Sequence, residues 1–330
     1  MQSDTQFESA KQDGYIKIHV KSYSQNRYEP KANATGCSLG VDSFSSILHH
    51  IDKSCLEGYR LTHLTYFNVG AHGTKDLKGT EESFFHDLKT IQKFGEEIGL
   101  PVVWVNTNLQ VLYQDFTFNQ SHTFENPSVV LALQKLFKRY FYASGCTFLD
   151  YNLKELLESF VYLEDPILAR ISTECTSLMS DDYDLSRTDK TRYIANHPIT
   201  YKNLYVCLKE QISNDNGDDI IASIKDKTRN CSRCEKCMRT LLTLDIIHAT
   251  KQYESIFDLR YFEKAKKFYI GKVLAYRKSD SYYSDIYGLM KKEKYDIPLY
   301  SKVFAPFYRL FKLLAPEKLY SKFLRKYRQQ

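Results

Sequence analysis

Short apolar segments alternate with longer amphipathic segments along the first two thirds of this 330-residue chain. The short segments predict strands at residues 15–20, 32–37, 61–69, 101–106 and 204–207. The longer segments have apolar residues three and four positions apart and predict helices at residues 44–51, 81–98 and 128–142. Strands that alternate with helices at this spacing form parallel sheets, because each parallel connection needs a crossover. The sequence therefore predicts an α/β, Rossmann-like fold with a parallel sheet and helices on both faces.

The composition is that of a folded protein. Hydrophobic residues make up 43% of the chain and charged residues 26%, which allows a real core and excludes a disordered chain. No stretch reaches the roughly 18 uncharged apolar residues of a membrane span. The N-terminal residues are polar and lack the apolar core of a secretory signal. We therefore expect a cytoplasmic protein, in which clustered cysteines are more often metal ligands than disulfides.

Charge is spread unevenly along the chain. Residues 261–330 contain 17 Lys and Arg against 6 Asp and Glu, a local charge of +11, whereas residues 1–260 contain 29 against 34. The basic region also has apolar residues at helical spacing, namely Phe304, Phe307, Tyr308 and Phe311. We expect residues 251–330 to form a basic helical extension. Such a segment either packs on the body, or binds a protein partner, RNA or an anionic membrane.

A serine-rich loop lies between the strand at 32–37 and the helix at 44–51, with the sequence GCSLGVDSFSS. A turn of this kind at the start of a helix presents backbone N–H groups at the positive end of the helix dipole. The loop can therefore hold phosphate oxygens, with hydroxyl groups from Ser38, Ser43 and Ser45. Asp42 would bind a divalent cation that the phosphates carry. Alternatively, Asp42 or Ser43 caps the helix and has no ligand.

Three of the eight cysteines lie within seven residues, as Cys231-x2-Cys234-x2-Cys237. Four thiolates satisfy the tetrahedral preference of zinc, and Cys207 is the best fourth ligand. The predicted site is closed and structural. An iron–sulfur cluster, a redox pair or reduced core cysteines are the alternatives. The remaining cysteines are expected to be small core residues, namely Cys37, Cys55, Cys146 and Cys175.

The two motifs together resemble a known superfamily. Ser38, Gly40, Asp42 and Ser43 match the SGGxDS loop of the PP-loop ATP pyrophosphatases, which have the adenine nucleotide α-hydrolase-like fold. Leu39 stands where that family usually has glycine. The cysteine pattern, followed by Arg239, is similar to the zinc site of the 7-cyano-7-deazaguanine synthases of the same superfamily. The resemblance covers about residues 30–250.

The resemblance implies roles for particular residues. Those expected to bind the nucleotide are Ser38, Leu39, Gly40, Val41, Asp42, Ser43, Asn68 and Gly145. Those expected in catalysis are Asp42, Ser43, Ser144 and Lys190. The implied cofactors are ATP, Mg²⁺ and Zn²⁺. The chain is then expected to divide into an ATP-binding domain at 1–200, a zinc-binding segment at 201–250 and the basic extension at 251–330.

The activity implied by the resemblance is ATP-dependent adenylation. An oxygen of a substrate carboxylate or amide would attack the α-phosphate and release pyrophosphate, before amide, amidine or nitrile formation. The substrate would be a small molecule or a protein, and a homo-oligomer is possible. Two alternatives stay open: a degenerate nucleotide-binding module that acts as a subunit or sensor, and an enzyme of tRNA or nucleobase modification.

Overall fold

The computed structural model describes residues 28–70, 77–113, 115–116, 118–150, 160–207 and 229–314. The strand predicted at 15–20 lies outside these residues. The chain forms two compact units: one comprises residues 1–37 and 46–183, the other residues 38–45 and 184–330.

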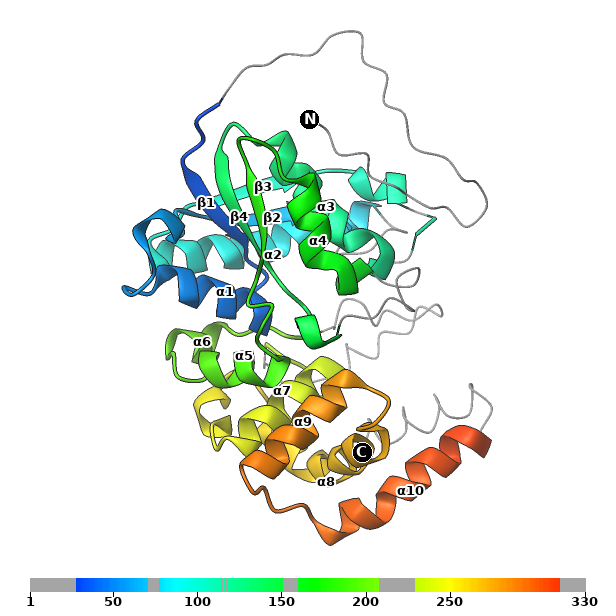
Figure 1. Ribbon diagram of the computed structural model, residues 1–330. Helices are drawn as coiled ribbons and strands as arrows, with labels where there is room; N and C mark the ends of the chain where they lie inside the picture. The colour runs from blue at the N-terminus through cyan, green and yellow to red at the C-terminus, as the bar shows by residue number, and fades with distance from the viewer. Residues whose placement is uncertain are drawn as a thin grey trace. The chain divides into compact units, whose positions relative to one another are not determined.

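A five-stranded parallel sheet forms the first unit (Figure 1). Its strands are β1 (Ala32–Gly36), β2 (His63–Asn68), β3 (Val102–Asn106), β4 (Phe137–Ala143) and β5 (Ser177–Asp181). Their order across the sheet is β3-β2-β1-β4-β5, and every neighbouring pair is parallel. The predicted Rossmann-like α/β architecture is therefore confirmed. Because all strands point the same way, their carboxyl ends lie along one edge of the sheet.

Helices cover both faces of this sheet, as Figure 1 shows. They are α1 (Val41–Ile51), α2 (Leu77–Ile98), α3 (Phe118–Ala132) and α4 (Glu164–Ile171). On one face, Phe84 of α2 stacks on Tyr66 of β2, and His50 of α1 stacks on Phe141 of β4. On the other, α3 and α4 bury Val129 and Leu168 in a cluster with strand residues.

Two predicted elements are wrong. The helix predicted at 128–142 ends at Ala132, and β4 begins at Phe137. The apolar spacing fitted a helix, but Phe137–Ala143 is rich in aromatic residues that favour a strand between two partners. The strand predicted at 204–207 does not form. Instead, the Asn230 side-chain amide accepts from Val206 N–H and donates to Leu204 C=O, so a side chain replaces a partner strand.

Helices dominate the second unit, and they confirm the helical C-terminal region. They are α5 (Arg187–Ile194), α6 (Ile199–Asn203), α7 (Glu235–Ile246), α8 (Leu259–Tyr276), α9 (Ser281–Lys292) and α10 (Leu299–Leu314). Glu235 of α7 accepts hydrogen bonds from Tyr269 and Tyr283 and pairs with Lys272, which ties α7 to α8 and α9. No described helix is long and apolar enough to cross a lipid bilayer.

Candidate functional site

The loop at residues 38–40 leads into the first turn of α1, and both belong to the second unit. Leu39 has a φ of 58°, in the left-handed region that favours glycine, and its side chain is buried. Its carbonyl accepts from Tyr205 N–H at 2.8 Å. Ser43 Oγ accepts from Ser38 N–H at 3.1 Å, and Gly40 N–H donates to Ser38 Oγ at 3.3 Å. Hydrogen bonds thus hold a tight turn in front of a helix N-terminus.

Asp42 lies inside the first turn of α1, and its carboxylate forms an ion pair with Arg187. Lys190 Nζ is 3.9 Å from Asp42 Oδ1. Both cations come from α5, and Lys190 is almost fully buried, with a side-chain exposure of 2%. A buried lysine and a partly buried arginine at a helix N-terminus create a strongly positive environment, which favours an anion.

Two further cations come from α7. Burial lowers the pKa of Lys236, and the positive charges of Arg187 and Arg239 lower it further, whereas Asp42 acts in the opposite direction. Arg239 is 9% exposed and lies over the ring of Tyr282, 3.8 Å from its centroid. Four cationic side chains therefore act on the region around the Asp42 carboxylate. We call Arg187, Lys190, Lys236 and Arg239 the cation cluster.

Some polar atoms of this region have no hydrogen-bond partner among the described residues. They are Asp42 Oδ1, Arg187 Nε and Arg239 Nε, and all three are buried. Buried polar atoms are nearly always hydrogen-bonded, so these three atoms have capacity for a ligand or for water. The two arginine N–H donors suit an anion, and the carboxylate oxygen of Asp42 suits a cation that the anion carries.

Asp285 of α9 is hydrogen-bonded to the first turn of α5, the helix that carries Arg187 and Lys190. Its carboxylate accepts from Thr188 N–H at 3.0 Å and from Thr188 Oγ1–H at 2.7 Å. Thr188 lies in the first turn of α5, next to Arg187 and two residues before Lys190. Burial raises the pKa of Asp285, and the hydrogen bonds from Thr188 oppose this rise. The basic extension thereby holds the start of the helix that presents two of the four cations.

The four predicted metal ligands do come together. The sulfur atoms of Cys207, Cys231, Cys234 and Cys237 all lie within 4.8 Å of one another. Cys231, Cys234 and Cys237 are buried, with exposures of 5%, 3% and 0%. Backbone N–H groups already point at sulfur, from Cys231 to Cys207 Sγ at 3.4 Å and from Cys234 to Cys231 Sγ at 3.3 Å. N–H donors of this kind stabilise thiolates.

The protonation of the four thiols shows why a cation belongs there. Hydrogen bonds among the thiols lower the pKa of Cys231 and raise the pKa values of Cys207 and Cys237. Four thiols this close cannot all ionise together without a positive charge between them. A metal ion provides that charge, and four sulfur ligands in a closed, buried site fit a zinc ion. The described cysteines form no disulfide in the structure.

The remaining predicted site residues belong to the first unit, after the ends of strands. Asn68 ends β2, is 1% exposed and donates to Asn106 Oδ1 at 2.8 Å. No described residue is hydrogen-bonded to Asn68 Oδ1, which is buried. Ser144 follows β4, and its hydroxyl donates to Cys146 C=O within its own turn. Among the described residues, a Cβ on Gly145 would meet only Val161, at 3.9 Å.

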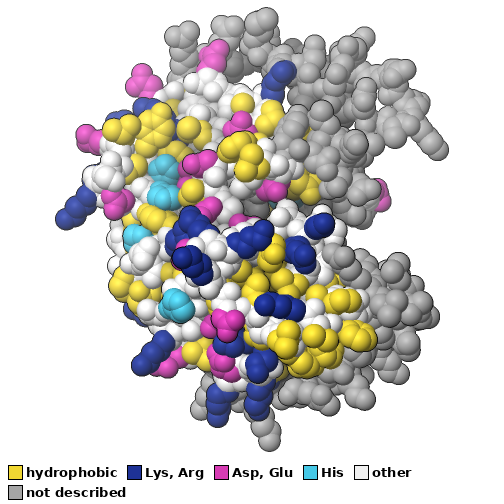
Figure 2. Space-filling model, turned by 60° about the horizontal axis from the view of Figure 1, so that its bottom comes forward, with side chains coloured by type: hydrophobic (Ala, Val, Ile, Leu, Met, Phe, Trp, Pro, Cys, Tyr) yellow, Lys and Arg dark blue, Asp and Glu magenta, His cyan; other side chains and the backbone are white. Residues whose placement is uncertain are grey.

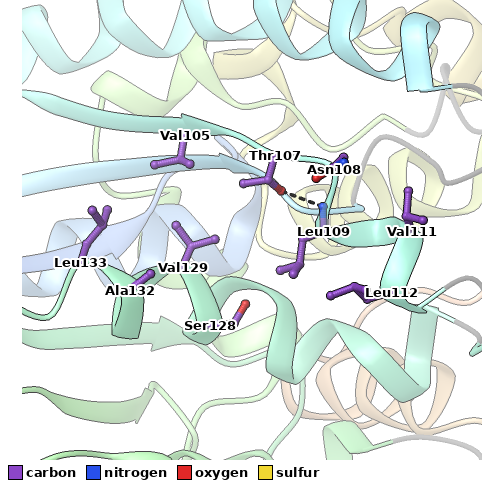
Figure 3. A pocket seen from close by; sticks show the side chains of 10 residues that line it. All are labelled: Val105, Thr107, Asn108, Leu109, Val111, Leu112, Ser128, Val129, Ala132 and Leu133. Carbon is purple, nitrogen blue, oxygen red and sulfur yellow. Dashed lines mark hydrogen bonds between the residues drawn. The ribbon is translucent and has the colours of Figure 1, made fainter. Parts of the chain in front are cut away.

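A cavity of about 460 Å³ opens beside the carboxyl end of β3 in the first unit (Figure 3). Apolar side chains form most of its wall, from β3, the 3₁₀ turn at Leu109–Tyr113 and α3. The hydroxyl of Thr107 donates to Asn68 C=O and accepts from Leu109 N–H, and that of Ser128 donates to Glu125 C=O. These hydroxyls are already satisfied, so the cavity suits an apolar group.

Three residues of this region were not predicted from the sequence, namely Arg187, Lys236 and Asp285. Of the residues in α5, only Lys190 was predicted as a site residue, and Lys236 stands between Cys234 and Cys237. Asp285 lies far away in the basic extension. Their roles arise from the packing of α5, α7 and α9, and no local pattern marks them. Comparison of the chain with protein-family models, curated proteins and solved structures gave no match.

Proposed function

We propose that this protein is an ATP-dependent enzyme of the PP-loop pyrophosphatase class, which adenylates a substrate and releases pyrophosphate. The observation that carries the proposal is the cation cluster around the N-terminus of α1, with unsatisfied donors at Arg187 Nε and Arg239 Nε. The resemblance of the loop at 38–43 to the SGGxDS motif and the zinc-type cysteine site support the same class.

Pyrophosphate fits this region better than a singly charged anion does. Several positive groups in one partly buried place suit a ligand with several negative charges. The Ser38–Ser43 turn would offer N–H and hydroxyl donors to the β- and γ-phosphates. Leu39 adopts the left-handed backbone that a glycine would take there, so its side chain does not prevent the loop conformation.

In the proposed reaction, a carboxylate or amide oxygen of the substrate attacks the α-phosphorus of ATP. A new P–O bond forms, the bond to the bridging oxygen breaks, and pyrophosphate leaves with the electron pair. A nitrogen or sulfur nucleophile then displaces AMP. Lys190 and Arg187 would stabilise the negative charge that grows on the phosphates, which is electrostatic preorganisation. Magnesium, bound to the phosphates and to Asp42, would add positive charge.

The ion pair between Asp42 and Arg187 gives this site a defined resting state. Without nucleotide, each group neutralises the other. With MgATP, Asp42 would turn to the metal and Arg187 to the phosphates, so neither charge would be left without a partner. The proposed zinc ion has a structural role, because Cys234 is the N-cap residue of α7 and Cys237 lies in its first turn, next to Lys236. The nucleotide-binding roles of Asn68 and Gly145 and the catalytic role of Ser144 stay predictions.

Binding of MgATP and of inorganic pyrophosphate, measured by calorimetry, tests the anion site. We expect Arg187→Ala and Asp42→Asn to keep the fold, and Arg187→Ala to weaken pyrophosphate binding at least about tenfold. Lys278→Ala is the matched control, because Lys278 is an exposed cation of the same unit. Equal binding by wild type and Arg187→Ala would refute the assignment.

Turnover separates an enzyme from a binding module. Radiolabelled ATP is incubated with the protein and with pools of small carboxylates and amides, and labelled AMP and pyrophosphate are measured. We expect AMP and pyrophosphate from wild type and none from Asp42→Ala. ATP binding without AMP formation from any pool would favour the nucleotide-binding module instead.

A further inference from the structure

Helix α10 has two different faces along the same sixteen residues. Its inner face packs on α8, where Phe304 and Tyr308 lie against Gly271, and Ser301 donates to Lys267 C=O at 2.7 Å. Phe268 of α8 also makes edge contacts with Tyr300 and Phe304. This face accounts for the fixed position of the helix in the second unit.

The outer face of α10 is apolar as well, but it faces solvent. Leu299 is 75% exposed, Val303 54% and Phe307 57%. These three residues are four positions apart, so they form one stripe along the helix. Single exposed apolar residues are ordinary, but a continuous stripe on one helix marks an interaction surface.

Exposed lysines accompany this stripe. Lys302 is on α10 itself, next to Val303, and Lys264 and Lys267 are on α8, the helix on which α10 packs. Figure 2 shows apolar side chains gathered on the face towards the viewer, with Lys and Arg side chains beside them. Over residues 261–330 the excess of basic over acidic residues is 11. The partner of such a surface should therefore be both apolar and negatively charged.

We propose that α10 and its flanking lysines dock this protein on an anionic lipid surface, with α10 lying in the plane of the membrane interface. Leu299, Val303 and Phe307 enter the boundary between headgroups and acyl chains, and the lysines contact anionic headgroups. With sixteen residues, α10 is shorter than the roughly 20 residues of a membrane span, so the proposed contact is an interfacial one. RNA binding fits less well, because two of the three stripe residues, Leu299 and Val303, are aliphatic and offer no surface for base stacking.

This docking goes beyond the proposed chemistry and does not depend on it. It would place an adenylating enzyme beside lipid-linked or membrane-bound substrates. The docking residues are distinct from Asp42 and the cation cluster, so the two proposals can fail separately.

Flotation of the full-length protein with lipid vesicles tests the docking. Vesicles of phosphatidylcholine containing phosphatidylserine are compared with vesicles of phosphatidylcholine alone. We expect at least about tenfold more protein on the anionic vesicles, decreasing with added salt. The double variant Val303→Glu, Phe307→Glu should lose at least about tenfold of this binding, because it places two negative charges in the apolar stripe.

Two control variants test whether vesicle binding depends on the apolar stripe and on the lysines beside it. Leu56→Glu changes an equally exposed leucine of the first unit, 73% exposed, and should bind like wild type. Lys267→Glu with Lys302→Glu leaves the apolar stripe intact, so it should weaken binding to anionic vesicles and leave binding to phosphatidylcholine vesicles unchanged. Circular dichroism and thermal unfolding check that each variant folds.

Three results would overturn the proposal. The first is the absence of wild-type binding to anionic vesicles, and the second is equal binding by wild type and Val303→Glu, Phe307→Glu. The third is evidence that the surface binds a different partner, either a second copy of the chain or RNA. If light scattering shows a dimer that this double variant dissociates, the stripe joins two copies of the chain. If labelled RNA binds and the double variant loses it, the surface serves nucleic acid.

Discussion

Leu39 allows a direct test of the loop geometry, because its backbone and its side chain have opposite preferences. The left-handed backbone at φ 58° favours glycine, whereas the buried side chain favours leucine. We predict that Leu39→Gly is as stable as Leu39→Ala, within about 1 kcal/mol. At most buried positions glycine is clearly the worse of the two.

The magnitude follows from separate contributions. Leu39→Ala removes a fully buried leucine side chain and should cost about 3–5 kcal/mol. The further step from alanine to glycine removes a methyl group, about 0.8 kcal/mol, and adds about 0.5–1 kcal/mol of unfolded-state entropy. At a left-handed position the same step relieves about 1–2 kcal/mol of steric strain. These contributions cancel, so the alanine-to-glycine step should be close to zero.

Leu242 provides the matched control. It is 0% exposed and lies within α7 of the same unit, where the backbone is helical. Its alanine-to-glycine step should cost about 2 kcal/mol, because glycine is about 1 kcal/mol worse than alanine in a helix and the methyl group is lost. Urea unfolding followed by circular dichroism measures all four variants. An alanine-to-glycine step as costly at Leu39 as at Leu242 would refute the left-handed assignment.

Three further predictions concern the second unit. Cys234→Ser should lose about one zinc per chain in metal analysis and unfold at lower temperature, whereas Cys175→Ser should keep its zinc; equal metal in both would exclude the cysteine site. Lys236→Met should keep or raise the thermal midpoint, because it removes a buried charge near two arginines. The same variant should weaken pyrophosphate binding. Unchanged pyrophosphate binding would show that Lys236 is not part of the anion site. Burial raises the pKa of Asp285 above its ordinary value of 3.8, so the folded protein holds a proton that the unfolded chain has lost, and the free energy of unfolding decreases as pH rises from 3.8 through the raised pKa. Asp285→Asn should remove this decrease in urea unfolding across pH, and a wild-type advantage that grows with pH in that window would contradict it.

The sequence predicted those parts of the fold that local patterns determine. β1, β2 and β3 lie where apolar runs ended at small or polar residues, and these runs are sufficient to predict a parallel sheet. β4 was predicted as part of a helix, because its apolar spacing satisfies both periods and only pairing with β1 and β5 decides between them. β5 has the sequence SLMSD, which contains too few apolar residues to predict a strand.

The residues of the candidate site also divide into those that local spacing predicts and those that only helix packing brings together. The loop at 38–43 and the cysteine ligands are defined by spacing within a few residues, and the structure gathers the four sulfur atoms as predicted. Arg187, Lys236 and Asp285 depend on how three helices far apart in sequence pack together. Their chemistry is visible in the sequence only as ordinary charged residues on amphipathic helices.

The Asn230 side chain has a consequence for engineering the protein. Its amide fixes Leu204 and Val206, and Cys231 N–H donates to Cys207 Sγ, so the two ends of the chain between 207 and 229 are tied together locally. Engineering should therefore keep Asn230, because replacing it would leave the buried Val206 N–H and Leu204 C=O without these partners beside Cys207 and Cys231, at a cost of about 1–3 kcal/mol for each group.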